Sequence, residues 1–139
     1  MDKALNYLGL MRKAGACAVG ETDCGAACRA GKVKLLLLAS DASENAHSRA
    51  KGFVYGRGIP LVVLPYTKLE LAGRLGKGAI SMMAVQDIGF AVALMKVLPE
   101  VDPAVVAKLE EKLAQYNKRK AEEKAHQRNK KIGKRRTKA

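Results

Sequence analysis

Residues 19–42 read VGETDCGAACRAGKVKLLLLASDA, and most of the architecture can be inferred from this segment. Gly20 frees the backbone ahead of a short helix with a polar first turn, and Gly31 fits the left-handed residue that ends a helix. Apart from Lys34, the run from Val33 to Ala39 is apolar, without the alternation of a half-exposed strand. It therefore predicts a strand that is buried on both faces of a sheet.

The same kinds of pattern extend outward in both directions. Apolar periodicity, glycines, prolines and capping residues predict further helices and strands. We expect helices over 2–13, 21–30, 42–55, 67–75 and 87–98, and strands over 16–19, 59–64 and 80–85. In the first helix, Leu5 and Leu8 are continued by either Leu10 or Met11. The strands 59–64 and 80–85 are apolar runs that we expect to be buried. Alternating strands and helices predict an α/β layered domain with helices on both faces of the sheet.

A last helix is predicted to begin at Asp102-Pro103, a capping residue followed by a proline at the first helical position. Its apolar stripe consists of Val105 or Val106, then Leu109, Leu113 and Tyr116. The stripe ends where a run of basic residues begins, so we expect a helix that docks first and then projects into solvent or frays. The chain is therefore divided into a domain over 1–101 and a C-terminal helix over 102–139 that runs into a basic tail, which can be disordered.

The charge is distributed unevenly between these two parts. Lys and Arg number 26 against 13 Asp and Glu, which gives a formal net charge of +13. Residues 103–139 hold 13 of the basic side chains and only 4 of the acidic ones. Such a tail is typical of a segment that binds a polyanion, most commonly nucleic acid. A membrane surface is disfavoured, because the tail lacks the bulky apolar face of a membrane-bound helix.

Signatures of catalysis, of metal binding and of export are missing from the sequence. The Gly73–Gly78 segment has neither the spacing nor the hydroxyl of a phosphate-binding loop, and Gly56-Arg57-Gly58 does not complete a dinucleotide motif. Structural zinc sites usually combine two separate clusters of ligands, and this sequence has only one cluster of cysteines, Cys17, Cys24 and Cys28. We therefore expect reduced, partly buried thiols. No catalytic residue, metal or cofactor is predicted. The expected location is the cytoplasm, with the protein a monomer.

The order of elements, together with five local motifs, resembles the ribosomal L-seven-Ae and L-thirty-e superfamily of kink-turn RNA-binding proteins, and its short bacterial members in particular. The resemblance covers residues 3–98. It is carried by residues 20–23, 29–43, 58–60, 75–77 and 87–91. It implies a three-layer α/β/α sandwich around a small mixed four-stranded sheet, followed here by the C-terminal helix. It also implies binding to structured RNA, without catalysis or cofactor.

In that family the helix that begins after the glycine reads guanine edges with an asparagine, a glutamate and a lysine. Those places are held here by Thr22, Asp23 and Ala26. Asp23 keeps a carboxylate that can accept from guanine N–H groups, Thr22 can make one hydrogen bond, and Ala26 can make none. Three residues further on the same helix face, Arg29 can supply the missing cation. The expected RNA contacts of this segment are Gly20, Glu21, Thr22, Asp23 and Arg29.

The second contact that the resemblance implies is the loop 77–81. Its expected RNA-binding residues are Lys77, Gly78, Ala79, Ile80 and Ser81. Gly78 and Ala79 would let the backbone approach RNA, while Ile80 would pack on an unstacked base. The loop 40–43 is expected to lie beside it. The alternative for both loops is a simple connection between a helix and a strand.

The sequence thus predicts a non-enzymatic, ribosome-associated RNA-binding protein of the translation apparatus, which recognises structured, kink-turn-like RNA, ribosomal RNA in particular. Phosphate contacts are expected in the tail from Lys118, Arg119, Lys120, Arg128, Lys130, Lys131, Lys134, Arg135 and Arg136. Two alternatives remain open. The protein can bind ribosomal RNA through charge alone, because two of the three reader positions are changed, or it can act as an adaptor that docks a partner protein through its C-terminal helix.

Overall fold

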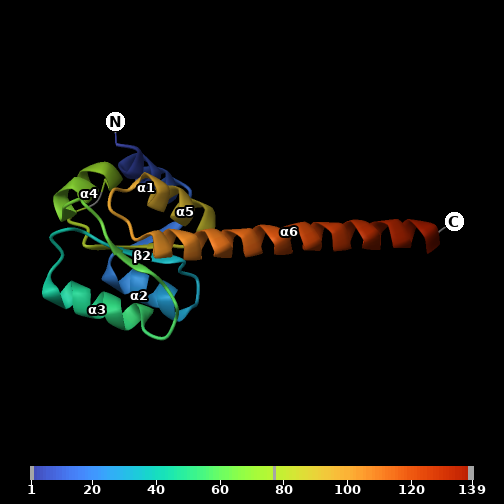
Figure 1. Ribbon diagram of the computed structural model, residues 1–139, viewed down its shortest axis with the longest axis horizontal. Helices are drawn as coiled ribbons and strands as arrows, with labels where there is room; N and C mark the ends of the chain where they lie inside the picture. Colours follow the sequence, from blue (N-terminus) through green and yellow to red (C-terminus); the bar gives the residue numbers. More distant parts are fainter. Residues whose placement is uncertain (1, 77, 138–139) are drawn as a thin grey trace.

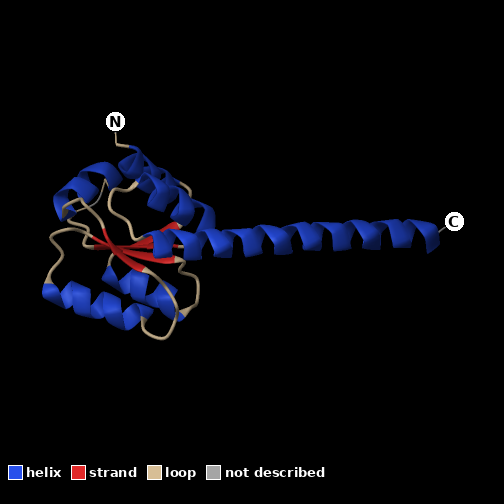
Figure 2. Ribbon diagram, in the orientation of Figure 1, coloured by secondary structure: helices blue, strands red, loops and turns tan. Residues whose placement is uncertain are grey.

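The computed structural model describes residues 2–76 and 78–137, with side chains described as far as Gln127. Four strands form one sheet between two helical layers, which confirms the predicted α/β/α sandwich with a C-terminal helix (Figures 1 and 2). The elements along the chain are α1 (Lys3–Lys13), β1 (Cys17–Val19), α2 (Glu21–Arg29), β2 (Leu35–Leu38), α3 (Glu44–Val54), β3 (Leu61–Val63), α4 (Lys68–Leu75), β4 (Met82–Val85), α5 (Ile88–Val97) and α6 (Pro103–Thr137).

The sheet is mixed, with the strand order β1-β4-β2-β3. Strand β4 lies antiparallel to both β1 and β2, whereas β2 and β3 are parallel. The parallel pair is joined through α3, because parallel neighbours need a crossover connection. The two central strands, β2 and β4, are buried along their whole length.

Strand β2 supplies leucines to two separate cores. Leu35 and Leu37 pack with residues of α1, α4, α5 and α6 on one face of the sheet. Leu36 and Leu38 pack with residues of α2 and α3 on the other face. Successive side chains of a strand point to opposite faces, so an unbroken apolar run is needed where both faces are covered. The predicted double burial of this strand is therefore confirmed.

Two other strand predictions need correction. The run 59–64 is not a buried strand, since β3 lies at the edge of the sheet and Val63 is 51% exposed. The strand predicted from Ile80 begins only at Met82. The amide of Ile80 donates instead to the carbonyl oxygen of Lys68, 3.4 Å away, so at this point the chain lies against the first residue of α4 and has not yet joined the sheet.

The predicted starts of α1, α4, α5 and α6 are confirmed, each at a residue whose side chain accepts hydrogen bonds from the first-turn amides. Thr67 and Glu70 form both bonds of the capping box, and Asp87 accepts from the amide of Phe90. Asp102 accepts from the amide of Ala104 at the start of α6. In α1, Met11 rather than Leu10 completes the buried face, because Leu10 is 52% exposed.

Helix α6 docks through its first turns and then leaves the body, as Figure 1 shows. Leu109 is fully buried against the core, and Lys96 of α5 pairs with Glu110 at 3.3 Å. From Ala114 to Gln127 every described side chain is exposed. Of the two predicted outcomes for this segment, the structure shows the projecting helix. Over the part of the chain described, no helix combines the length and the apolar character needed to span a membrane.

Candidate nucleic-acid interface

The start of α2 differs from the other described helix starts, because no side chain caps it. Its N-cap residue is Gly20, whose backbone lies at φ 95° and ψ 154°. This conformation is essentially restricted to glycine. The first-turn amides consequently keep their donors for an outside acceptor, in the positive field of the helix N-terminus. Beside them, Thr22 and Asp23 are exposed.

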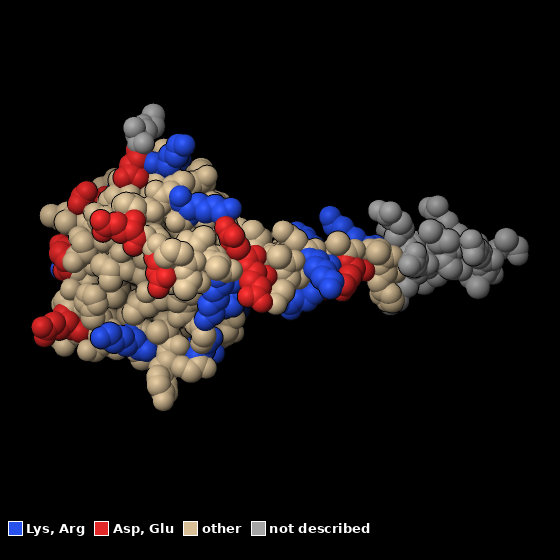
Figure 3. All heavy atoms as spheres, viewed as in Figure 1, with Lys and Arg blue, Asp and Glu red and all other residues tan. Residues whose placement is uncertain are grey.

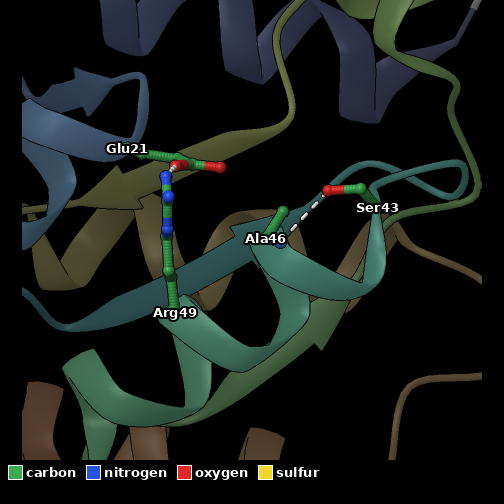
Figure 4. A network of polar contacts seen from close by, with 4 residues as sticks. All are labelled: Glu21, Ser43, Ala46 and Arg49. Carbon is green, nitrogen blue, oxygen red and sulfur yellow. Dashed lines mark hydrogen bonds and ion pairs between the residues drawn. The ribbon is translucent and has the colours of Figure 1, made fainter.

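Glu21 is held by a residue that no local sequence pattern indicated. The guanidinium of Arg49, from α3, donates to its carboxylate across the gap between the two helices (Figure 4). Close by, Ser43 caps α3 by accepting from the amide of Ala46 at 3.2 Å. Arg49 is separated from Glu21 by 28 positions in the chain, so only the tertiary fold reveals this pair. Of the two acids in the first turn of α2, Asp23 is therefore the more accessible.

Backbone hydrogen bonds bring two loops to the tip of α2. The amide of Gly20 donates to the carbonyl oxygen of Met82 at 3.0 Å, which fixes the tip next to the loop 78–81. The amide of Ala39 donates to the carbonyl oxygen of Ser81 at 2.9 Å, so the loop 40–43 begins beside it, as predicted. Three segments far apart in sequence thus meet at one end of the sheet. We call this convergence the α2-tip surface, defined as residues 20–23, 40–43 and 78–81.

Within the loop 78–81, the structure separates exposed residues from a core residue. Gly78 and Ala79 are exposed, and Ser81 is half-buried. Ile80, in contrast, is only 3% exposed and belongs to the core formed with α1, α4 and α5. The prediction that Ile80 packs on an RNA base is therefore wrong, since its burial contributes about 1.5–3 kcal/mol that contact with RNA would forfeit. Lys77 lies outside the described residues.

Arg29 lies in the last turn of α2, away from the tip, but its side chain reaches back along the helix. Gly25 makes room for it: a Cβ built there would stand 3.3 Å from Nη1 of Arg29 and 2.8 Å from the ring of Phe53. Helical side chains lean toward the N-terminus, which brings Arg29 nearer to Ala26. The predicted closing glycine is confirmed, because Gly31 has φ 72° and its amide donates to the carbonyl oxygen of Cys28.

The predicted phosphate contacts on α6 divide into two sets. Lys118, Arg119 and Lys120 are exposed on the projecting helix. Figure 3 shows basic side chains along the described part of α6 and at its junction with the body. The other predicted phosphate contacts fall outside the described side chains; these are Arg128, Lys130, Lys131, Lys134, Arg135 and Arg136.

All three cysteines are free thiols, as expected. The side chain of Cys24 is buried between α2 and the sheet, and its thiol donates to the carbonyl oxygen of Ala18 at 3.6 Å. Burial raises the pKa of the Cys24 thiol to about 12, so it stays protonated at neutral pH. Across the described residues, no group of three or more Cys, His, Asp and Glu side chains is placed to hold a metal ion.

Known proteins resemble this chain in fold more than in sequence. No protein-family model and no curated protein matches the sequence. A protein with unknown function from Bacillus halodurans superposes with a TM-score of 0.65 at 28% identity, over 72% of this chain and all of that chain. The Giardia lamblia 15.5 kD RNA-binding protein superposes with a TM-score of 0.56 at 16% identity, over 77% of this chain and 84% of that one. These similarities show a shared fold.

Proposed function

We propose that this protein is a non-enzymatic RNA-binding protein of the translation apparatus that recognises structured RNA of the kink-turn type. The single observation that carries the proposal is the α2-tip surface. There, uncapped helix amides, the exposed carboxylate of Asp23 and the exposed backbone of Gly78 and Ala79 meet at one end of the sheet. The RNA-binding activity named for the Giardia lamblia protein of the same fold supports this assignment.

Each part of the surface has a chemical role in this proposal. The Asp23 carboxylate accepts hydrogen bonds from guanine N–H groups, and Thr22 adds one donor or acceptor. Uncapped amides at the helix start donate to phosphate or base oxygens. The small residues Gly78 and Ala79 let the RNA backbone approach closely. Arg29 takes the place of the lysine that the resembling family carries at the position of Ala26.

In this proposal, the body and α6 have different roles in binding RNA. The body reads the shape of the RNA, and the basic face of α6 adds phosphate contacts that strengthen binding to any RNA. Ribosomal RNA in the cytoplasm is the proposed partner, with the protein bound as a monomer. Lys118, Arg119 and Lys120 are the described contributors to the phosphate contacts.

The deciding experiment compares two RNAs with the full-length protein. One is a kink-turn RNA with tandem sheared G·A pairs, and in the other these pairs are replaced by Watson–Crick pairs. We expect the wild type to prefer the kink-turn by about tenfold or more, since a good base contact is worth about 1–3 kcal/mol. Asp23→Ala should bring the ratio close to one.

The control variant is Glu111→Ala, which removes an exposed acid on α6 and so changes the net charge equally. It should keep the preference for the kink-turn. If the wild type binds both RNAs equally, the protein binds RNA through charge alone and the kink-turn assignment fails. Copurification of a protein partner that survives nuclease and high salt would instead identify an adaptor.

A further inference from the structure

A basic groove lies where α6 leaves the body, on a different part of the molecule from the α2-tip surface. Its volume is about 570 Å³. The body contributes the segments that follow α2 and α3, with Val33 and Ile59 among the apolar lining, and α6 contributes the opposite wall. Five basic residues line this groove, namely Lys34, Arg57, Lys112, Arg119 and Lys120.

The positive charges of the groove are not balanced by acids in its lining. Glu123 is the one acidic residue among the described lining residues. Burial, followed by the charges of Lys108 and Lys34, lowers the pKa of Lys112 from its ordinary value. Like charges held this close together favour the binding of an anion between them.

Two hydrogen bonds position α6 against the body without neutralising the positive charges of the groove. Lys108 and Lys112 both donate to the carbonyl oxygen of Gly58, at 2.9 and 3.3 Å, and so fasten α6 to the loop after α3. A carbonyl oxygen is neutral, so both ammonium charges remain uncompensated. At the mouth, Tyr116 is 47% exposed, and the Lys120 ammonium lies 5.6 Å from the centre of its ring.

We propose that this groove binds one single-stranded segment of RNA, with its phosphates on the basic rim and an unpaired base stacked on Tyr116. The apolar lining and the half-exposed ring fit an unpaired base, which a duplex would keep inside its stack. Exposed basic side chains also stand on α6 at Lys118, beside the groove, and at Lys124, beyond it, as a chain of phosphates requires and a small anion does not.

The inference rests on the proposed function only in taking RNA as the ligand. The α2-tip surface lies at the N-terminus of α2, whereas Gly31 and Lys34 of the groove follow its C-terminus. Nine residues of helix separate the two ends by about 13 Å. A single-stranded extension of a structured RNA can therefore occupy the groove while the folded part contacts the tip.

The test uses the full-length protein and an unstructured adenine–uridine RNA of about 12 nucleotides, within the range that single-strand-binding sites cover. The groove variant is Lys34→Gln/Arg119→Gln/Lys120→Gln. Its matched control is Lys3→Gln/Lys13→Gln/Lys51→Gln, which removes three exposed charges of α1 and α3 that do not line the groove. Both variants lose the same formal charge, so they differ in where the charge is removed.

We expect the groove variant to bind this RNA at least about tenfold more weakly than wild type, and the control by about threefold or less. The slope of log affinity against log salt should become shallower by about 2 in the groove variant, at about 0.7 per lost phosphate contact. Tyr116→Leu should weaken binding by about fivefold or more and leave the salt slope unchanged, because a stacking contact carries no charge. Circular dichroism should show that all three variants are folded.

Equal losses in the groove and control variants would overturn the inference and leave nonspecific attraction to the net positive charge of the protein. Inorganic pyrophosphate that displaces the RNA at equal phosphate concentration would also overturn it and identify a small-anion site. Asp23→Ala should bind the unstructured RNA as wild type does. A loss of kink-turn preference in the earlier experiment therefore tests the α2-tip surface, while this experiment tests the groove.

Discussion

The amide of Gly20 donates a hydrogen bond of 3.0 Å to the carbonyl oxygen of Met82, and this bond ties the start of α2 to the first residue of β4. Gly20 can make it because its backbone lies at φ 95° and ψ 154°, where a side chain is strained. The position of the start of α2 relative to the loop 78–81 thus depends on the absence of a Cβ at Gly20.

Gly20→Ala should lower the free energy of unfolding by about 1–3 kcal/mol, the usual cost of forcing a side chain into a sparsely populated backbone region. Urea denaturation measures this directly. Gly78→Ala is the control for stability, because a Cβ at Gly78 meets nothing within 4 Å and its φ is not positive. Equal stability of the two variants would show that Gly20 tolerates a side chain.

Gly25→Ala should destabilise the protein by about 1 kcal/mol or more, even though alanine favours helix. The new Cβ would stand 2.8 Å from the ring of Phe53, so either the ring or the helices α2 and α3 must shift, and overpacking of this kind costs about 1–3 kcal/mol. In α4, Gly73→Ala meets no neighbour within 4 Å and should stabilise by up to about 1 kcal/mol. Thermal unfolding of the two variants should shift in opposite directions.

The phenol of Tyr66 donates a hydrogen bond of 2.6 Å to Asp2, which also caps α1. This bond is the main cause that lowers the pKa of Asp2. A carboxyl group with a lowered pKa stabilises the fold above its unfolded pKa of about 4, and the contribution disappears as the pH falls through the folded value. Tyr66→Phe should therefore cost about 1 kcal/mol at pH 7 and less at pH 3. Denaturation at both pH values checks this, and an equal cost would contradict it.

Cysteine modification should follow burial. Burial raises the pKa of all three thiols, but Cys17 is partly exposed, whereas Cys24 and Cys28 are buried. Because the thiolate is the reactive form, iodoacetamide at pH 8 should label Cys17 first. Labelling of the other two should require denaturant, as peptide mass spectrometry can determine. Rapid labelling of Cys24 in the native protein would show that α2 opens readily from the sheet.

Removal of residues 118–139 should weaken binding to all RNAs by a similar factor and flatten the salt dependence, because this segment holds 11 of the 26 basic side chains. The preference for a kink-turn should persist, since the α2-tip surface is untouched. Filter binding over a range of salt concentrations measures both quantities. If the truncation abolished the preference as Asp23→Ala is expected to do, the proposed division between body and tail would be wrong.

Local patterns in the chain were sufficient to predict the elements and their layering. The leucine run of β2, the capping box at Thr67 and the glycine after α2 each act within a few residues, through periodicity, capping and backbone freedom. The same local patterns gave the wrong environment for Val63, because an apolar residue does not state whether its strand is central or at an edge. The expected contact of Ile80 with RNA came from the family resemblance, which does not state which way a loop side chain points in this chain.

Tertiary structure alone decided which segments meet. The contact of Arg49 with Glu21, the bond from Gly20 to Met82 and the groove between Lys34 and Arg119 join residues far apart in the chain. Their proximity follows from the strand order and from the docking of α6 on α5, which depend on long-range packing. Propensity and patterning act over short stretches of chain, so they specify individual helices and strands. The surfaces formed by several elements exist only once the two cores have packed on the two faces of the sheet.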